Sequence, residues 1–198
     1  ALTSFVGYGL GQWLPAFFIR LHSMGLAETA TYYGLVNGLA SMAGTFLGGT
    51  LADRWAIRDQ RVYTWLPGIG ILISFPFYFA ALIVDDWRVA IAILLVPSFL
   101  NSLWLGPAFG TVQNLAPQPM RALASAILLF ILNIIGLGFG PFLVGVLSDV
   151  LTPSYGEESL RYAIIIATAA YFWAGAPFLL AGRTIVADLK RAKDEASG

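Results

Sequence analysis

The sequence has no cysteine, a single histidine and few charged residues for its length of 198. Without cysteine it can form neither disulfides nor a thiolate metal site, and one histidine, His22, cannot supply a zinc-binding HExxH motif. Only 11% of the residues are charged, against roughly a quarter in an average soluble domain. Eleven basic residues balance eleven acidic ones, so no basic field is available to bind nucleic-acid phosphates. We expect no metal, no cofactor and no nucleic-acid partner, and no special role for His22.

Apolar residues dominate instead, at 58% of the chain with a mean hydropathy of +0.77. A soluble fold of this size cannot bury so much apolar surface. About 20 apolar residues in a helix cross a hydrocarbon core of roughly 30 Å, and six charge-free stretches reach that length. They run from the start to about Ile19, from about Ala30 to Ala52, from Val62 to Val84, from Val89 to about Leu115, from Ala122 to Ser148 and from Tyr162 to Gly182. We expect an all-α polytopic membrane protein with six transmembrane helices.

The distribution of lysine and arginine predicts the orientation. Residues 1–184 form the expected six-helix bundle, and residues 185–198 form a polar tail. One side of the membrane would hold Arg54, Arg58, Arg61, Arg121, Arg183, Lys190, Arg191 and Lys193, and the other only Arg20, Arg88 and Arg161. This bias places the C-terminal tail in the cytoplasm. We expect the protein itself to lie in an inner or plasma membrane. The chain opens on an apolar segment without an initiator methionine, so we expect a preceding part to be missing.

An internal repeat relates the second span to the fifth. Residues 37–53 and 133–149 align without gaps and share Asn37/Asn133, Gly44/Gly140, Phe46/Phe142, Leu47/Leu143, Gly49/Gly145, Leu51/Leu147 and Asp53/Asp149. The chain therefore divides into two related triplets of spans, at about residues 1–86 and 87–184. Because three is odd, the second triplet must be inverted relative to the first. A 3+3 inverted repeat is typical of secondary transporters, whose site lies near the bilayer midplane.

Uncharged polar side chains are the candidates for a cavity. No Asp, Glu, Lys or Arg lies in the middle of a span. The expected cavity residues are the amides Gln12, Asn37, Asn101 and Asn133, with Tyr8 and Tyr33 on the same faces by i, i+4 spacing. We expect spans one, two, four and five to line a cleft, and three and six to face lipid. Alternatively, the amides only bond neighbouring helices, at about 0.6 kcal/mol each.

A second set of residues suggests gating. A carboxylate at a helix C-terminus is disfavoured by the helix dipole and needs a cation nearby. Asp53 lies at the C-terminal end of the second expected helix, and its repeat counterpart Asp149 lies at the C-terminal end of the fifth. The expected gating residues are Asp53, Arg54, Arg58, Arg61, Arg121 and Asp149, with Gly140 and Pro141 as a helix flexure. We interpret Asp53 and the arginines as a cytoplasmic latch; the alternative is a static capping pair.

No catalytic constellation accompanies these features: GxGxxG, Walker A and GxSxG motifs are absent. An enzyme is therefore not expected. Inverted duplication favours transport, since it supplies two near-equivalent packings. A non-transporting membrane scaffold or assembly subunit remains an alternative, as does a passive facilitator.

Three stretches resemble a known family. The segment from Gly48 to Arg54, followed by Arg58 and Arg61, resembles the GxLaDRxGRR loop signature of the major facilitator superfamily, with Ala56 where the family usually has glycine. GLGFGPFLVG, from Gly136 to Gly145, resembles the family's Gly-Pro helix motif. GPAFGTVQNLAPQPMRALASA, from 106 to 126, followed by GPFLVGVLSD, from 140 to 149, resembles the spinster-like branch.

The resemblance implies that the chain is the C-terminal six-helix half of a twelve-helix transporter. Its partner would be the missing N-terminal half, and the two would rock about a central cavity in alternating access. Proton coupling is typical of the superfamily, and some animal spinster-like proteins are linked to lysolipids and sphingoid lipids. The expected substrate is a small organic or lipid-like molecule, with the bilayer as the other partner.

Overall fold

A computed structural model of the chain describes residues 1–197, and the side chains of residues 193 and 195–197 are outside that description. Every secondary-structure element of the described part is helical, which confirms the all-α class. The longer helices are α1 (Leu2–Leu21), α2 (Leu26–Ala56), α3 (Val62–Ile83), α4 (Trp87–Ser102), α5 (Leu105–Leu115), α6 (Arg121–Leu132), α7 (Gly140–Tyr155), α8 (Ser159–Ala181) and α9 (Ile185–Ser197). Short 3₁₀ turns, η1 (Gln118–Met120) and η3 (Gly156–Glu158), and a π-helical segment, η2 (Asn133–Phe139), complete the chain.

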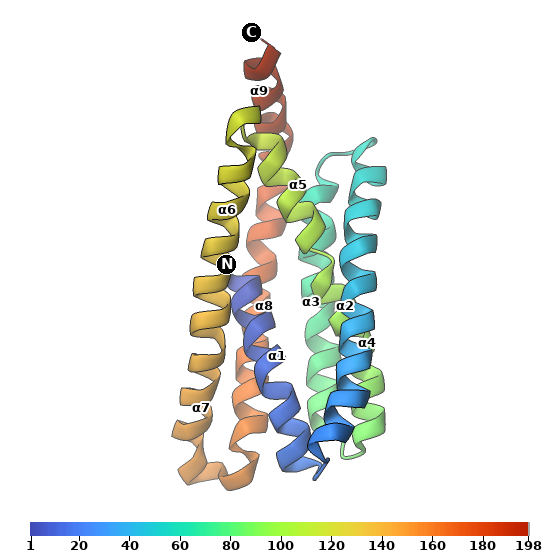
Figure 1. Ribbon diagram of the computed structural model, residues 1–198, viewed down its shortest axis with the longest axis vertical. Coiled ribbons are helices and arrows are strands. Elements are labelled where there is room, and N and C mark those ends of the chain that lie inside the picture. The colour runs from blue at the N-terminus through green and yellow to red at the C-terminus, as the bar shows by residue number, and fades with distance from the viewer. Residues whose placement is uncertain (198) are drawn as a thin grey trace.

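Four stretches of the described chain are long and apolar enough to cross a membrane: Leu26–Ala56, Val62–Ile83, Trp87–Leu115 and Gln118–Ala181. The last has 64 residues, which would make a straight helix of roughly 96 Å at about 1.5 Å per residue. The chain instead reverses between α7 and α8 (Figure 1), where Gly156 has a φ of 54° that favours glycine. The six-span 3+3 arrangement stays a prediction.

The helices run side by side along one long axis (Figure 1). The closest partners are α3 with α8, α3 with α4, and α2 with α4, whereas α1 packs on α7, α8 and η2. Glycine makes two of these approaches possible. A Cβ at Gly44 would collide with the backbone carbonyl of Phe99 on α4, and a Cβ at Gly140 with the carbonyl of Phe5 on α1. Small residues that let helices approach closely are typical of membrane bundles.

The interior and the outer surface are both apolar. Leu10, Phe17 and Phe18 of α1 are almost completely buried at the centre of the core. On the outside, Phe46 of α2 and Trp173 of α8 are 70% and 77% exposed. Such exposure is unfavourable in water but suits a hydrocarbon environment. The protein is accordingly an integral membrane protein.

The expected polar tail is a helix, α9, rather than an extended chain. Ile185 and Leu189 are buried on one of its faces, each 4% exposed. The basic side chains Lys190 and Arg191 point away from this buried face. The side chain of Lys193, which also entered the orientation argument, and residue Gly198 lie outside the described part of the chain.

Candidate functional site

An open cleft of about 430 Å³ lies between the helices of the two triplets. It is lined by Thr3, Ser4, Gly7, Tyr8, Gly11, Leu14, Tyr33, Asn37, Ser41, Thr45, Tyr78, Ser98, Asn101, Ser102, Trp104, Leu105, Leu129, Leu132 and Asn133. These residues come from α1 to α6 and the start of η2. None of the described residues that line the cleft carries a formal charge, so its wall offers hydroxyl, amide and aromatic groups only.

Five of the six residues predicted for a cavity line this cleft: Tyr8, Tyr33, Asn37, Asn101 and Asn133. Gln12 does not; its side chain is exposed outside the lining. The spacing of four residues between Tyr8 and Gln12 corresponds to about 400° on an α-helix. Gln12 is therefore rotated by roughly 40° from Tyr8 in the sense opposite to Ser4, which is rotated by the same angle and does line the cleft. The role of Gln12 stays a prediction.

Asn101 is the cleft residue with an unmet hydrogen bond. Its Oδ1 is buried and accepts no hydrogen bond from the described residues. A Cβ at Gly7 would lie only 3.3 Å from Nδ2 of Asn101, so the glycine leaves room for this amide. Asn133 differs, because its Nδ2 donates to the carbonyl of Leu129 at 2.9 Å in its own helix. An unpaired buried acceptor costs roughly 1–3 kcal/mol, so the Oδ1 atom of Asn101 is available to a hydrogen-bond donor, and its role in binding stays a prediction.

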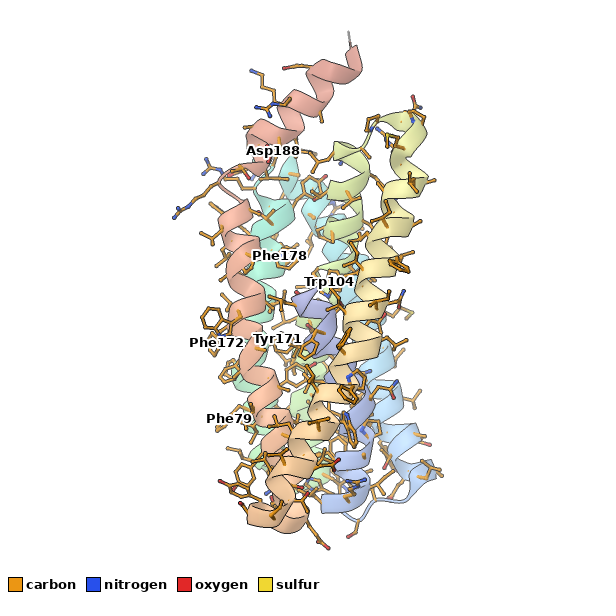
Figure 2. All side chains as sticks on the ribbon, turned by 90° about the vertical axis from the view of Figure 1, so that its left-hand side faces the viewer. Phe79, Trp104, Tyr171, Phe172, Phe178 and Asp188 are labelled. Carbon is orange, nitrogen blue, oxygen red and sulfur yellow. The ribbon has the colours of Figure 1, made fainter. Side chains whose placement is uncertain are left out.

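The third span also reaches the cleft, which differs from the expectation that it faces only lipid. Tyr78 of α3 is 4% exposed and lines the cleft beside Tyr33. Its ring stacks on that of Tyr171 of α8, with centroids 5.7 Å apart. In Figure 2 Tyr171 points into the bundle, whereas Phe79 and Phe172 lie on its outer side. Amides, and tyrosines four residues from them, predicted the cleft, so Tyr78 was missed because the third span contains no amide; a tyrosine in an otherwise apolar span is the signal that could have identified it.

The backbone beside the cleft is irregular where Gly140 and Pro141 were expected to form a flexure. The π-helical segment η2 ends at Phe139, and Pro141 occupies the first turn of α7. The indole Nε1 of Trp13 on α1 donates to the carbonyl of Pro141 at 2.8 Å. π-helical turns are frequent at functional sites. The segment is thus held against α1 by a specific bond, and its role as a flexure stays a prediction.

A separate pocket of about 500 Å³ lies at the end of the bundle that carries α9. Asp53, Arg121 and Leu189 are among its lining residues. The two charged side chains share the pocket without forming an ion pair. Instead, Oδ1 of Asp53 accepts a hydrogen bond from the hydroxyl of Tyr63 at 2.9 Å. This bond joins α2 to α3 across their connection.

The other expected gating residues are not part of that contact. Arg54 and Arg58 are exposed, and Arg61 lies over the ring of Trp65, with 5.8 Å between its guanidinium carbon and the ring centroid. Asp149 is exposed on α7, a helix that runs toward the end of the bundle opposite α9 (Figure 1). The latch therefore stays a prediction, and sequence reasoning missed its bonded partner, Tyr63.

Comparisons of the sequence with known proteins identify transporters as its relatives. No protein-family model matches the chain. It is 35% identical, over 89% of its length, to an MFS-type efflux pump of Mycolicibacterium smegmatis. It is 26% identical over 99% of its length to protein spinster homolog 1 of Homo sapiens. The chain spans 41% of the length of each of these two relatives.

The solved structures that resemble this chain belong to the same group of transporters as its sequence relatives. The chain matches a bacterial homologue of the human lysosomal transporter Spinster in an inward-facing, unoccupied conformation, with a TM-score of 0.86 and 26% identity. The match covers 94% of this chain and 46% of that one. The same kind of protein in an inward-facing, occupied conformation matches with a TM-score of 0.84. The resemblance to spinster-like transporters of the major facilitator superfamily is confirmed, and these relatives are transporters rather than enzymes.

Proposed function

We propose that this spinster-like chain is the C-terminal six-helix half of a secondary active transporter that moves a small organic or amphipathic, lipid-like solute by alternating access. The observation that carries this proposal is the uncharged polar cleft, where the buried acceptor of Asn101 has no partner among the described residues. A static scaffold would gain nothing from leaving such an acceptor unpaired, since the cost is roughly 1–3 kcal/mol. A substrate that donates a hydrogen bond removes that cost.

The packing supports an exchange between two inverted triplets. Gly44 in the second span lets α2 approach α4, and its repeat counterpart Gly140 in the fifth span lets α7 approach α1. Each triplet thus inserts its second helix against the first helix of the other. The third and sixth spans, α3 and α8, also pack on each other. Equivalent contacts of this kind in the two triplets allow the inward-open and outward-open arrangements to have similar packing.

The substrate class follows from the chemistry of the wall. Hydroxyl and amide groups line the cleft beside aromatic rings such as Trp104, with no cation to hold an anionic group on this side. This combination suits the boundary between the polar and apolar parts of an amphipathic molecule. Because the cleft has no acidic residue, we assign ion coupling to residues of the preceding half.

Gating would occur at the α9 end of the bundle. Asp53 and Arg121 line one pocket there, and opening the cleft toward the cytoplasm would separate the helices that carry them. An interfacial contact of this kind contributes about 0–1 kcal/mol, which is enough to bias two states of similar free energy. The excess of basic residues at this end supports a cytoplasmic C-terminus in an inner or plasma membrane.

Reconstitution of the full-length protein tests this proposal. Proteoliposomes would be given a fluorescent lysolipid, with a radiolabelled sugar as a polar comparison, and a pH gradient that a protonophore can abolish. We expect gradient-dependent movement of the lysolipid. Asn101→Leu and Asn133→Leu should impair it without loss of membrane insertion, and Gln12→Leu should have the smaller effect because Gln12 lies outside the cleft lining.

The same assay separates the alternatives. Movement that ignores the gradient would identify a passive facilitator. Failure to move either probe under any gradient would favour the scaffold. Normal transport by both asparagine variants would show that the amides serve helix packing only.

A further inference from the structure

A cluster of titratable groups lies at the end of the bundle opposite α9, away from both the cleft and the latch. It surrounds His22, which follows α1 and was expected to have no special role. The Nδ1 atom of His22 lies 3.0 Å from the backbone carbonyl of Asp85, in the connection between α3 and α4. Its ring packs against Phe17 and Phe18, with centroids 5.1 and 5.5 Å away. His22 therefore joins the end of α1 to the connection between α3 and α4.

The tautomer of His22 follows from this contact. A carbonyl oxygen only accepts, so Nδ1 must carry the hydrogen, and in the neutral ring Nε2 is a bare acceptor. That Nε2 is buried without a hydrogen-bond partner among the described residues. Protonation would add an N–H there with no acceptor to receive it, and would add a positive charge to a half-buried ring.

A cation already occupies the neighbourhood. Arg161 of α8 has its guanidinium carbon 5.9 Å from the ring centroid of Phe17, the same ring that contacts His22. The Nε atom of Arg161 is also buried, with no hydrogen-bond partner in the part of the chain that the structure describes. One carboxylate neutralises part of its charge, since Glu158 of η3 accepts from Nη1 at 2.7 Å. A protonated His22 would be a second cation in this cluster.

The remaining charged groups at this end, which include Asp85 and Glu157, are exposed. Asp86 accepts from the backbone N–H of Arg88 at 2.7 Å as the cap of α4, and Arg88 lies over Trp87. Glu28 faces the backbone N–H of Gly25 at 3.4 Å. Arg20 lies over Trp13. Asp85 and Asp86 attract a proton to His22, but from exposed positions where solvent weakens the attraction.

We propose that His22 is a proton-sensitive clasp: in its neutral form it ties the end of α1 to the α3–α4 connection beside Arg161, and protonation releases this contact. The clasp does not depend on the proposed transport activity. It makes the conformational equilibrium of this end of the bundle respond to pH without any acidic residue in the cleft.

The direction of the response follows from the environment of the ring. Burial, opposed in part by the hydrogen bond to Asp85 and reinforced by Arg161, lowers the pKa of His22 below its ordinary value of 6.5. Above that value both the clasped and the released ring are neutral. As the pH falls through about 6.5, a released and solvated His22 takes up the proton first. The clasped state therefore loses stability on acidification and regains it as the pH rises.

Distance measurements between spin labels test the clasp. In the full-length protein in nanodiscs, cysteines replace Leu26 and Val150, which are 76% and 68% exposed and lie outside the cluster. Electron–electron resonance would record their separation at about pH 7.5 and about pH 5, on either side of the usual histidine pKa of roughly 6.5. We expect the distance population found at the higher pH to decline at the lower one.

Two variants identify the responsible group. His22→Gln cannot take up a proton and should abolish the response to pH. Arg161→Gln keeps the histidine but removes a neighbouring cation that lowers the pKa of the clasped ring. The clasped and released rings then differ less in proton affinity, so the clasped population should fall less between the two pH values. An unresponsive wild type, an equal response in His22→Gln, or an undiminished response in Arg161→Gln would each overturn the clasp. If His22→Gln does not fold, the comparison of the wild type with Arg161→Gln decides alone.

Discussion

Replacing Gly44 by alanine should weaken the contact between α2 and α4 in a way that a nearby glycine does not share. The new Cβ would collide with the carbonyl oxygen of Phe99, and would lie 3.0 Å from both the carbonyl carbon of Phe99 and the Cβ of Ser102. Backbone atoms of a packed helix cannot rotate aside, so the two helices must separate. Gly38, on the same helix, has open space within 4 Å of its Cβ position, and Gly38→Ala is the matched control.

The magnitude has two parts. An alanine in a helix interior gains roughly 0.5–1 kcal/mol over glycine, and both variants share this gain. Overpacking costs about 1–3 kcal/mol, and only Gly44→Ala bears this cost. We expect Gly38→Ala to be neutral or slightly stabilising and Gly44→Ala to be destabilising. The difference between the two variants should be about 1–3 kcal/mol.

Unfolding of the full-length protein in mixed detergent micelles, followed by circular dichroism, measures both free energies. The comparison is informative because any effect of glycine replacement on the unfolded state is common to the two variants. Equal free energies of unfolding for Gly44→Ala and Gly38→Ala would refute the close packing of α2 on α4.

Two further predictions concern single hydrogen bonds. Trp13→Phe removes the indole donor to Pro141 and should lower the free energy of unfolding by about 1 kcal/mol; an unchanged value in the same unfolding assay would contradict that bond. Asp53→Asn should raise the cytoplasmic labelling of a cysteine placed at Asn101 if the carboxylate charge closes the latch. Tyr63→Phe removes the hydroxyl donor to Asp53 but keeps the charge of the carboxylate. If labelling rises in Tyr63→Phe and not in Asp53→Asn, the hydroxyl rather than the charge closes the cleft, which would count against the electrostatic latch.

The helical class and the apolar character of the surface were predictable because they depend on local properties. Hydropathy and spacing along the chain identify helices of membrane length, and most of the expected span limits lie within a few residues of helix ends, as at Val62 and Leu115. The asparagines that line the cleft could also be predicted from the sequence. An uncharged amide in an apolar stretch is conspicuous in the sequence, because few polar groups are tolerated there.

Contacts between distant segments were decided only by the tertiary structure. Tyr78 reaches the cleft and Gln12 does not because helix rotation depends on which neighbours pack against each face. Asp53 bonds to Tyr63 rather than to Arg121, although charge alone favoured the arginine. His22 lies 63 positions from its partner Asp85 in the chain, and the fold buries its Nε2 atom where no described residue bonds to it. The sequence by itself determined where the chain is apolar enough to form helices in a membrane, since that is a sum over neighbouring residues. The tertiary structure decided which polar atoms bond to one another and which are left without a partner. This depends on how the packed helices are rotated relative to one another, and local hydropathy does not determine that rotation.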